Sequence, residues 1–176
     1  MLNHLYFMHS VEQAQARRMP PLAGKLKSDY GLSGKPFAAE RLHATLHDLG
    51  AYLSLPPDLV ARAREAASSV VLPPFEVVFD RVHTFSGRQG DRPLVLRGGE
   101  ELVALQHAIG EAMRKAGLGT FVNRSFTPHI TLLRGEGAVE EQMVETFRWT
   151  VREFTLVNSL VKRSRYVSIE RWTLRG

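Results

Sequence analysis

Hydrophobic and polar residues alternate along several short stretches of the chain, which is the pattern of strands that bury one face. Proline and glycine pairs such as Pro73-Pro74 and Gly98-Gly99 separate these stretches and mark turns. The predicted strands cover residues 2–8, 42–46, 75–79, 94–96, 128–132, 148–157 and 166–174. Strands are therefore expected along the whole length of the chain.

Three longer stretches have the residue spacing of helices. Residues 102–116 carry one apolar stripe, and residues 58–69 follow a proline pair that opens a helix. Residues 11–30 are helix-like but contain Pro20-Pro21. Because proline inside a helix removes a hydrogen bond and clashes with the preceding turn, this helix is expected to break near Met19.

The same order of elements occurs twice: a strand, a helix, and a strand with the motif His-x-Thr-Leu. The two copies are His43-Ala44-Thr45-Leu46 and His129-Ile130-Thr131-Leu132, and their histidines are 86 residues apart. This repetition predicts an internal duplication. One domain would then consist of two pseudo-symmetric lobes, approximately residues 1–85 and 86–176.

Each motif places an imidazole and a hydroxyl on the same face of a strand, because residues i and i+2 point the same way. His43 and Thr45 therefore project together, and so do His129 and Thr131. The alternate residues of each motif are apolar and anchor the strand in the core. If a pseudo-twofold axis relates the lobes, the two pairs face each other across one cleft.

Such a cleft suits in-line attack on a phosphodiester. The reaction needs a base for the attacking water and an acid for the departing oxygen, on opposite sides of the phosphorus. Histidine titrates near neutrality, so one imidazole can accept a proton while the other donates one. The threonine hydroxyls can donate hydrogen bonds to the phosphate oxygens. This scheme needs no metal ion and no other cofactor.

Composition and charge narrow this picture. The absence of cysteine excludes disulfides, thiol catalysis and zinc ribbons. The net charge is +5, and residues 86–176 hold 14 of the 23 lysines and arginines, so the field would concentrate anionic substrates such as phosphates or RNA. No basic leader opens the chain, and no apolar run reaches the roughly 18 residues of a membrane span. A cytoplasmic protein with no membrane partner is expected.

Longer segments extend both motifs. Residues 40–46 match the first motif of the 2H phosphoesterase superfamily, and residues 126–134 match the second, including the proline before the histidine. Residues 154–159 and 166–174 are similar to the C-terminal strands of that family. The chain therefore resembles the group of the bacterial 2′-5′ RNA ligases and RNA 2′,3′-cyclic phosphodiesterases.

The resemblance implies an α+β, bilobal fold, with antiparallel sheets lining a central cleft and helices outside. It implies that His43 donates and His129 accepts a proton when a 2′,3′-cyclic phosphate opens to a 2′-phosphate. Thr45 and Thr131 would hold the phosphate. In the reverse sense, the same site would join RNA ends by a 2′-5′ bond. The expected partner is RNA with a cyclic phosphate end or a cyclic nucleotide, bound by a monomer.

The substrate stays open because one position departs from the family pattern. The first motif continues as His47-Asp48-Leu49-Gly50, where RNA-processing members often have an aromatic residue before the glycine. RNA ends, small cyclic nucleotides and ADP-ribose cyclic phosphate are all compatible with the motifs. A second hypothesis is a non-enzymatic nucleotide- or RNA-binding module that keeps the cleft, although the intact histidines and threonines favour an enzyme.

Several further side chains are candidates with two interpretations each. Arg134 falls on the opposite face of a regular strand from Thr131, and it reaches the phosphate only if a turn redirects it. Tyr166 either stacks on a base or belongs to the sheet surface, and Phe121 and Phe126 have the same two interpretations.

Two histidines and one basic cluster complete the set of candidates. His47 shares the face of His43 in a regular strand, so it is expected to line or border the cleft rather than bind a metal ion. His107 is expected on the surface of its helix. Lys162, Arg163 and Arg165 form either a solvated turn or a contact for the RNA backbone.

Overall fold

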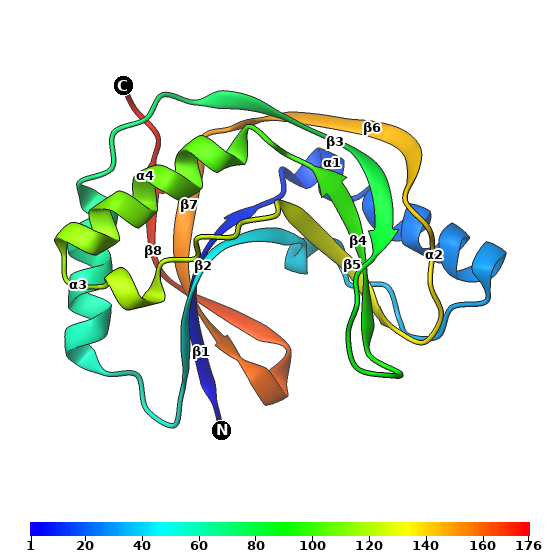
Figure 1. Cartoon of the computed structure of the whole chain (residues 1–176), viewed down its shortest axis with the longest axis horizontal. Helices are drawn as coiled ribbons and strands as arrows, with labels where there is room; N and C mark the ends of the chain where they lie inside the picture. The colour runs from blue at the N-terminus through cyan, green and yellow to red at the C-terminus, as the bar shows by residue number, and fades with distance from the viewer.

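The computed structural model describes all of residues 1–176, and its strands form two four-stranded antiparallel sheets (Figure 1). The first sheet has the strand order β2-β1-β7-β8, and the second has the order β5-β4-β3-β6. The strands of the first sheet are β1 (Asn3–Ser10), β2 (His43–Tyr52), β7 (Glu153–Leu160) and β8 (Arg165–Thr173). Those of the second are β3 (Phe75–Thr84), β4 (Arg92–Gly98), β5 (His129–Gly135) and β6 (Gln142–Val151). The expected α+β class is confirmed.

One predicted strand is wrong. Residues 148–157 were expected to form a single strand, but β6 ends at Val151 and β7 begins at Glu153, in the other sheet. The chain passes between the sheets at Arg152, whose carbonyl accepts a hydrogen bond from the Leu174 amide at 2.8 Å. Burial alternates from Phe147 to Arg152 and then gives way to four consecutive buried residues, Phe154 to Val157, so the alternation breaks where the chain changes sheet.

The sheets do not divide the chain near residue 85, since β3 and β4 on either side of that point are neighbours in one sheet. The first sheet takes its strands from both ends of the chain, and the second sheet takes its strands from the middle. Each sheet nevertheless ends on the strand that carries a His-x-Thr-Leu motif. The repeat therefore relates two sheets rather than two halves of the sequence.

The helices lie outside the sheets, and their ranges agree with the pattern. They are α1 (Gln13–Ala16), α2 (Met19–Tyr30), α3 (Pro57–Ser68) and α4 (Leu102–Lys115), with short 3-10 turns η1 (Ala39–Arg41), η2 (Gly119–Phe121) and η3 (Val161–Arg163). The break near Met19 is confirmed: Pro20-Pro21 lie in the first turn of α2, where no N–H is needed.

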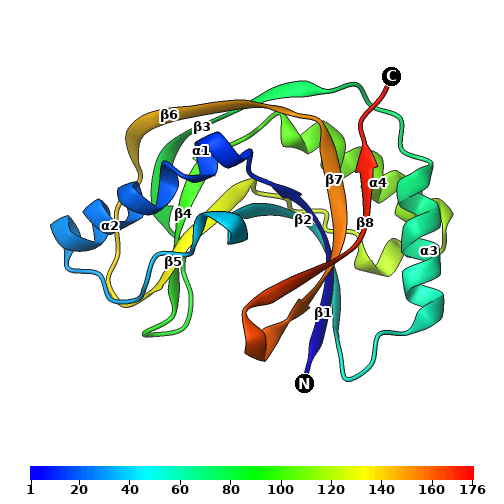
Figure 2. The same ribbon diagram turned by 180° about the vertical axis from the view of Figure 1, so that it is seen from behind.

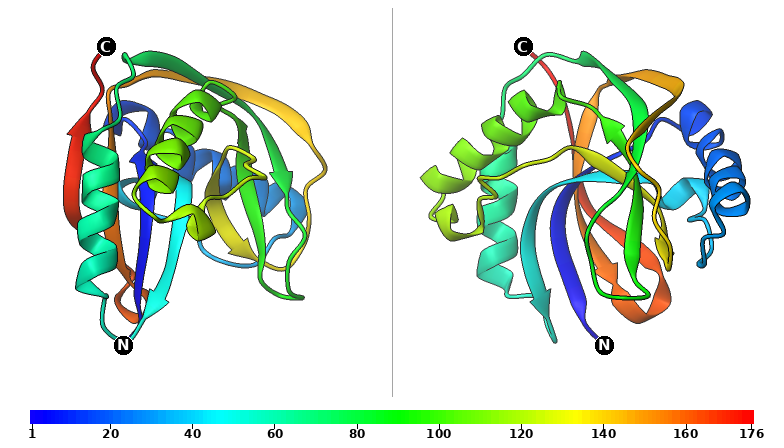
Figure 3. Two further views of the ribbon diagram at one scale, coloured as in Figure 1. Left: turned by 60° about the vertical axis from the view of Figure 1, so that its left-hand side comes forward. Right: turned by 45° about the vertical axis from the view of Figure 1, so that its right-hand side comes forward.

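Two helices pack against the sheet that does not contain the strand preceding them. α2 follows β1 of the first sheet but lies beside β5 of the second. α4 follows β4 of the second sheet but lies beside β2 of the first, where it also packs against α3 (Figures 1 and 3). This exchange brings the edge strands β2 and β5 next to each other.

The buried side chains form one core of 37 residues drawn from both sheets, with Phe7, Phe79, Phe147 and Phe154 among the largest fully buried members. A separate small cluster of Tyr6, Met8 and Val157 covers the opposite face of the first sheet, with Tyr166 packed against it. None of the helices combines the length and the apolar character needed to cross a membrane.

Candidate active site

The two motif histidines occupy equivalent positions, each as the first residue of an edge strand. His43 opens β2 and His129 opens β5, and these strands lie side by side where the two sheets meet (Figure 1). Ala44 and Ile130, one residue further, are buried in the common core, while Thr45 and Thr131 are partly exposed like the histidines. Strand alternation thus brings both imidazole–hydroxyl pairs to the junction of the sheets.

Both rings make the same hydrogen bond to the backbone. Nδ1 of His43 lies 2.8 Å from the carbonyl oxygen of Arg41, and Nδ1 of His129 lies 2.9 Å from that of Thr127. A carbonyl oxygen accepts hydrogen bonds only, so the proton of each neutral ring is on Nδ1. Each Nε2 therefore carries a lone pair and has no hydrogen-bond partner in the protein.

The electrostatic environment favours the neutral form of both rings. Burial lowers the pKa of His43, and the nearby charges of His129 and Arg41 lower it further, against the effect of the Arg41 carbonyl. Burial likewise lowers the pKa of His129, with contributions from Arg97 and Arg134. The two rings begin neighbouring strands, β2 and β5, so a positive charge on His129 disfavours one on His43.

Aromatic rings hold both imidazoles. Tyr6 stacks on His43 with 5.6 Å between ring centroids, and Tyr166 packs edge-on against the same ring at 5.2 Å. The Tyr166 hydroxyl lies 3.4 Å from the Arg41 carbonyl, the group that also binds His43. Phe85 packs edge-on against His129 at 5.1 Å. These contacts fix the ring planes, which a proton transfer to one defined position requires.

A β-bulge at the last residue of each motif changes which of the following residues face the cleft. The pairing of β1 with β2 shifts so that Leu46 is the extra residue, and the pairing of β4 with β5 shifts at Leu132. Two consecutive residues are buried in each strand as a result, and the next ones, Asp48 and Arg134, are exposed.

Arg134 is therefore not on the face opposite Thr131, as a regular strand would place it. The bulge returns its side chain to the side of Thr131 and His129, and its charge acts on the His129 ring. Its guanidinium Nη1 lies 3.8 Å from Asp91 and is half-exposed. The sequence contains no local signal for the bulge, because Leu132 and Leu133 fit a buried strand equally well.

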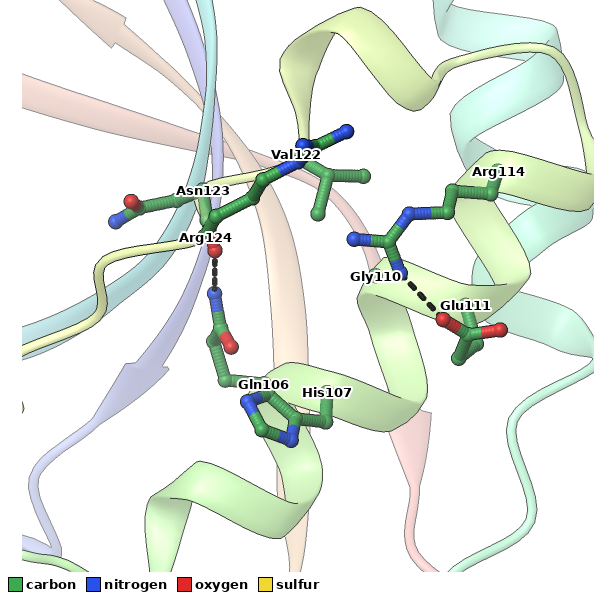
Figure 4. A pocket seen from close by; sticks show the side chains of 8 residues that line it. All are labelled: Gln106, His107, Gly110, Glu111, Arg114, Val122, Asn123 and Arg124. Carbon is green, nitrogen blue, oxygen red and sulfur yellow. Dashed lines mark hydrogen bonds and ion pairs between the residues drawn. The ribbon is translucent and has the colours of Figure 1, made fainter.

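The corresponding bulge in β2 shows that the prediction for His47 is wrong. This residue is 1% exposed and faces α4 instead of the cleft. Its Nε2 lies 2.7 Å from the Gln106 carbonyl, and its Nδ1 accepts a hydrogen bond from the Asn123 amide at 3.2 Å. The Gln106 side chain in turn donates to the Asn123 carbonyl at 2.8 Å, as Figure 4 shows. His47 thus joins β2 to α4 and to the segment that leads to His129.

A pocket of about 270 Å³ opens beside His129. Besides His129 and Thr45 it is lined by three phenylalanines and several polar residues: Phe85, Phe121, Phe126, Asp48, Asn123, Ser125 and Thr127. Phe121 and Phe126 therefore belong to the surroundings of the second motif. The volume is near the lower end of small-ligand pockets, which is roughly 300 Å³, and three rings with a polar rim suit a flat heterocycle.

Asp48 is a charged residue of this pocket that the sequence did not single out as functional. Its Oδ1 accepts hydrogen bonds from His4 Nε2 at 2.8 Å and from the Gly50 amide at 2.7 Å. The pKa of His4 is raised, chiefly by this hydrogen bond, and the pKa of Asp48 is lowered. Asp48 occupies the position after the first motif that Arg134 occupies after the second, so the two bulges expose side chains of opposite charge.

Two other histidines, His107 and His9, lie outside this pocket. His107 is exposed on α4, as expected, and borders a separate pocket of about 320 Å³ with Arg114 and Arg124 (Figure 4). His9 is buried: its Nδ1 donates to the Glu153 carbonyl at 2.8 Å and its Nε2 accepts from Trp149 at 3.0 Å. No group of three or more His, Asp or Glu side chains is arranged to hold a metal ion.

Comparison with known proteins agrees with this arrangement. The profile of the 2′-5′ RNA ligase superfamily matches residues 11–163. The RNA 2′,3′-cyclic phosphodiesterase of Escherichia coli (strain K12) is 32% identical over 160 residues, which covers 81% of each chain. The structure of E. coli LigT in apo form matches with a TM-score of 0.74 and 26% identity, over 100% of this chain and 99% of that one.

A second solved structure, E. coli LigT complexed with 3′-AMP, matches with a TM-score of 0.72 and 25% identity over 99% of both chains. The sequence profile spans most of the chain, and the curated relative exceeds 30% identity over four fifths of it. Together with two equivalent imidazoles at the junction of two sheets, these matches establish the family. The chain belongs to the 2′-5′ RNA ligase superfamily and is a 2H phosphoesterase, as its paired His-x-Thr-Leu motifs indicated.

Proposed function

We propose that this enzyme opens 2′,3′-cyclic phosphates of RNA ends or nucleotides to 2′-phosphates, with His43 as proton donor and His129 as proton acceptor. The observation that carries the proposal is the repeated hydrogen bond of the two rings. In each, a backbone carbonyl two residues before the histidine holds Nδ1 and leaves Nε2 available. Two such nitrogens can act on opposite sides of one phosphorus.

In the proposed step, the lone pair of His129 Nε2 takes a proton from water while the water oxygen forms a bond to phosphorus. The bond between phosphorus and the 3′-oxygen breaks, and protonated His43 gives its Nε2 proton to that oxygen. The products are a 2′-phosphate and a 3′-hydroxyl. When the 5′-hydroxyl of a second RNA takes the place of water, the same step forms a 2′-5′ linkage and leaves a 3′-hydroxyl, so hydrolysis and ligation differ in the attacking group and not in machinery.

Three further side chains are assigned to the phosphate. Thr45 and Thr131 project beside the imidazoles, and their hydroxyls make no hydrogen bond within the protein. Both can therefore donate to non-bridging oxygens as charge develops on them. Arg134 adds a positive charge on the side of Thr131, where it also favours release of a proton from His129. No metal ion is needed for any of these roles.

The substrate class follows from the pocket beside His129 and from the relatives. A curated relative is named for RNA 2′,3′-cyclic phosphate, and E. coli LigT has been solved with 3′-AMP. In this chain, the pocket with Phe85, Phe121 and Phe126 lies directly next to the proposed phosphate position, as a nucleoside attached to that phosphate requires. We assign this pocket to the base or ribose of the terminal nucleotide.

The first test is hydrolysis of 2′,3′-cyclic AMP by His43→Ala and His129→Ala. Each proton transfer typically contributes ~10²–10⁴-fold, so each variant is expected to lose at least about 100-fold in kcat. His107→Ala, which removes an exposed histidine outside both motifs and outside the pocket beside His129, is the matched control and should retain full activity. Activity should also persist in EDTA. Turnover at the wild-type rate by both single variants would exclude the proposed mechanism.

A further inference from the structure

The turn between β7 and β8 carries the densest group of unpaired positive charges in the molecule. Lys162, Arg163 and Arg165 follow one another almost directly, all three are exposed, and none makes an ion pair or a side-chain hydrogen bond. By contrast, the arginines on the second sheet near His129 have acidic neighbours. Arg81 pairs with Glu100, and Arg97 lies 3.9 Å from Glu141.

The turn is joined to the active site through β8. Arg165 begins β8, and the next residue, Tyr166, packs on the His43 ring. At about 3.3 Å per strand residue, the three cations lie within roughly 15 Å of that ring. The hairpin is also fixed at its base, where the Val161 amide donates to the Leu2 carbonyl at 3.3 Å.

The β7–β8 turn lies on the same side of the molecule as the turn between β3 and β4. Figures 1 and 2 show the β7–β8 hairpin bending away from its sheet toward the turn between β3 and β4 of the other sheet. An RNA whose 3′-terminal cyclic phosphate lies between His43 and His129 must leave the site on a side that no element closes. Its remaining nucleotides carry one negative charge each.

We propose that this basic turn, Lys162, Arg163 and Arg165, binds the phosphate backbone of single-stranded RNA upstream of the reacting end. The inference rests on the proposed function and adds that the enzyme acts preferentially on oligonucleotides rather than on mononucleotides. Three cations without acidic partners are available to replace the counterions of a phosphate chain, and their contribution does not depend on base sequence. A 2′,3′-cyclic mononucleotide has no phosphate that reaches the turn.

The test compares kcat/KM for 2′,3′-cyclic AMP and for a ten-nucleotide unstructured RNA ending in a 2′,3′-cyclic phosphate. The variant Lys162→Gln/Arg163→Gln/Arg165→Gln removes the three charges. The matched control, Lys25→Gln/Arg62→Gln/Lys115→Gln, removes the same charge from exposed positions on α2, α3 and α4. A charge-preserving variant, Lys162→Arg/Arg163→Lys/Arg165→Lys, separates loss of charge from damage to the hairpin.

For single strands the salt slope is about −0.7 per phosphate contact, so three contacts are worth up to about 100-fold at 0.1 M salt. The turn variant is expected to lose about 10- to 100-fold in kcat/KM for the oligonucleotide, with a correspondingly weaker salt dependence, and to keep its activity on 2′,3′-cyclic AMP. The two control variants should behave as wild type. If the wild-type enzyme hydrolysed neither substrate, the proposed function itself would be refuted.

Two results would overturn the inference. Equal losses on the mononucleotide and the oligonucleotide would mean that the turn acts through Tyr166 and His43 and not on the RNA chain. An unchanged oligonucleotide kcat/KM would mean that the backbone does not touch the turn. If the turn variant kept its kcat/KM for the oligonucleotide but lost a binding to phosphatidylserine vesicles that the wild type shows, the basic turn would instead bind an anionic membrane surface.

Discussion

At the scale of single residues, the candidate site contains two imidazoles in the same tautomer, each oriented by the backbone carbonyl two residues before it. Tyr6, Tyr166 and Phe85 fix the ring planes, and burial lowers both pKa values. The design leaves each Nε2 unoccupied and unprotonated near neutral pH. One of them must gain a proton before the enzyme can act as both acid and base.

This requirement predicts the pH dependence of the reaction. The proposed mechanism needs His43 protonated and His129 neutral, and the pKa values of both lie below the usual 6.5 in the free enzyme. Activity should therefore follow a bell whose maximum lies on the acid side of pH 6.5. The measurement is kcat/KM for 2′,3′-cyclic AMP between pH 4 and 9. A maximum at or above pH 7.5 would contradict the assignment of these two groups.

At the scale of elements, a bulge of one residue in each motif strand decides which side chains face the substrate. In β2 it turns His47 into the core and leaves Asp48 exposed, and in β5 it buries Leu133 and leaves Arg134 exposed. Both strands thus contain the bulge, but the residue buried after it is a histidine in β2 and a leucine in β5. Leu133 contacts only the core, whereas His47 connects β2 to α4 and to the segment before β5.

Replacing His47 with the residue that β5 has at this position tests the role of that connection. His47→Leu leaves the Asn123 amide and the Gln106 carbonyl without their buried partner, and each such loss costs ~1–3 kcal/mol. The free energy of unfolding, from urea denaturation at pH 7.5, should fall by about 2–4 kcal/mol. Leu133→Val, which removes one methylene from the equivalent buried position, should cost less, about 1 kcal/mol. Equal stability of His47→Leu and wild type would show that the connection is not stabilising.

At the scale of the whole molecule, two sheets share one core and exchange helices, and the site lies where their edge strands meet. Four histidines in this assembly, His9, His43, His47 and His129, have pKa values below 6.5, each mainly because of burial. His4 alone shows the opposite shift, through its bond to Asp48. The active-site histidines and the structural ones therefore respond to acid in the same direction.

The stability of the fold should consequently fall with acidity. A histidine whose pKa is lower in the folded than in the unfolded chain binds its proton more weakly when folded, so its contribution is complete above pH 6.5 and is lost as the pH falls below it. For the buried His9 and His47 the slope approaches ~1.4 kcal/mol per pH unit each. Urea denaturation between pH 7.5 and 5 should show this decrease, with a smaller slope in His9→Gln. A stability that rises over this range would contradict the burial of these rings.

The sequence by itself determined the family and most of the elements, and it predicted the reaction centre. Strand alternation fixes that His43 and Thr45, and His129 and Thr131, share a face, because the side-chain period of a strand is local. The helix ranges and the break before Pro20 follow from equally local rules. The repeat of the motif predicted two related units, and the family follows from the same residues.

Only the tertiary structure decided what surrounds that centre. Whether a strand continues or changes sheet at Arg152, and whether Leu46 and Leu132 form bulges, depends on the partner strands and not on the residues themselves. For this reason the sequence placed His47 on the cleft, where the structure buries it, and left two positions open for Arg134, which the structure places on the side of Thr131. The paired His-x-Thr-Leu segments specify the chemistry locally, whereas the positions of Asp48, Arg134 and the basic turn come from long-range pairing.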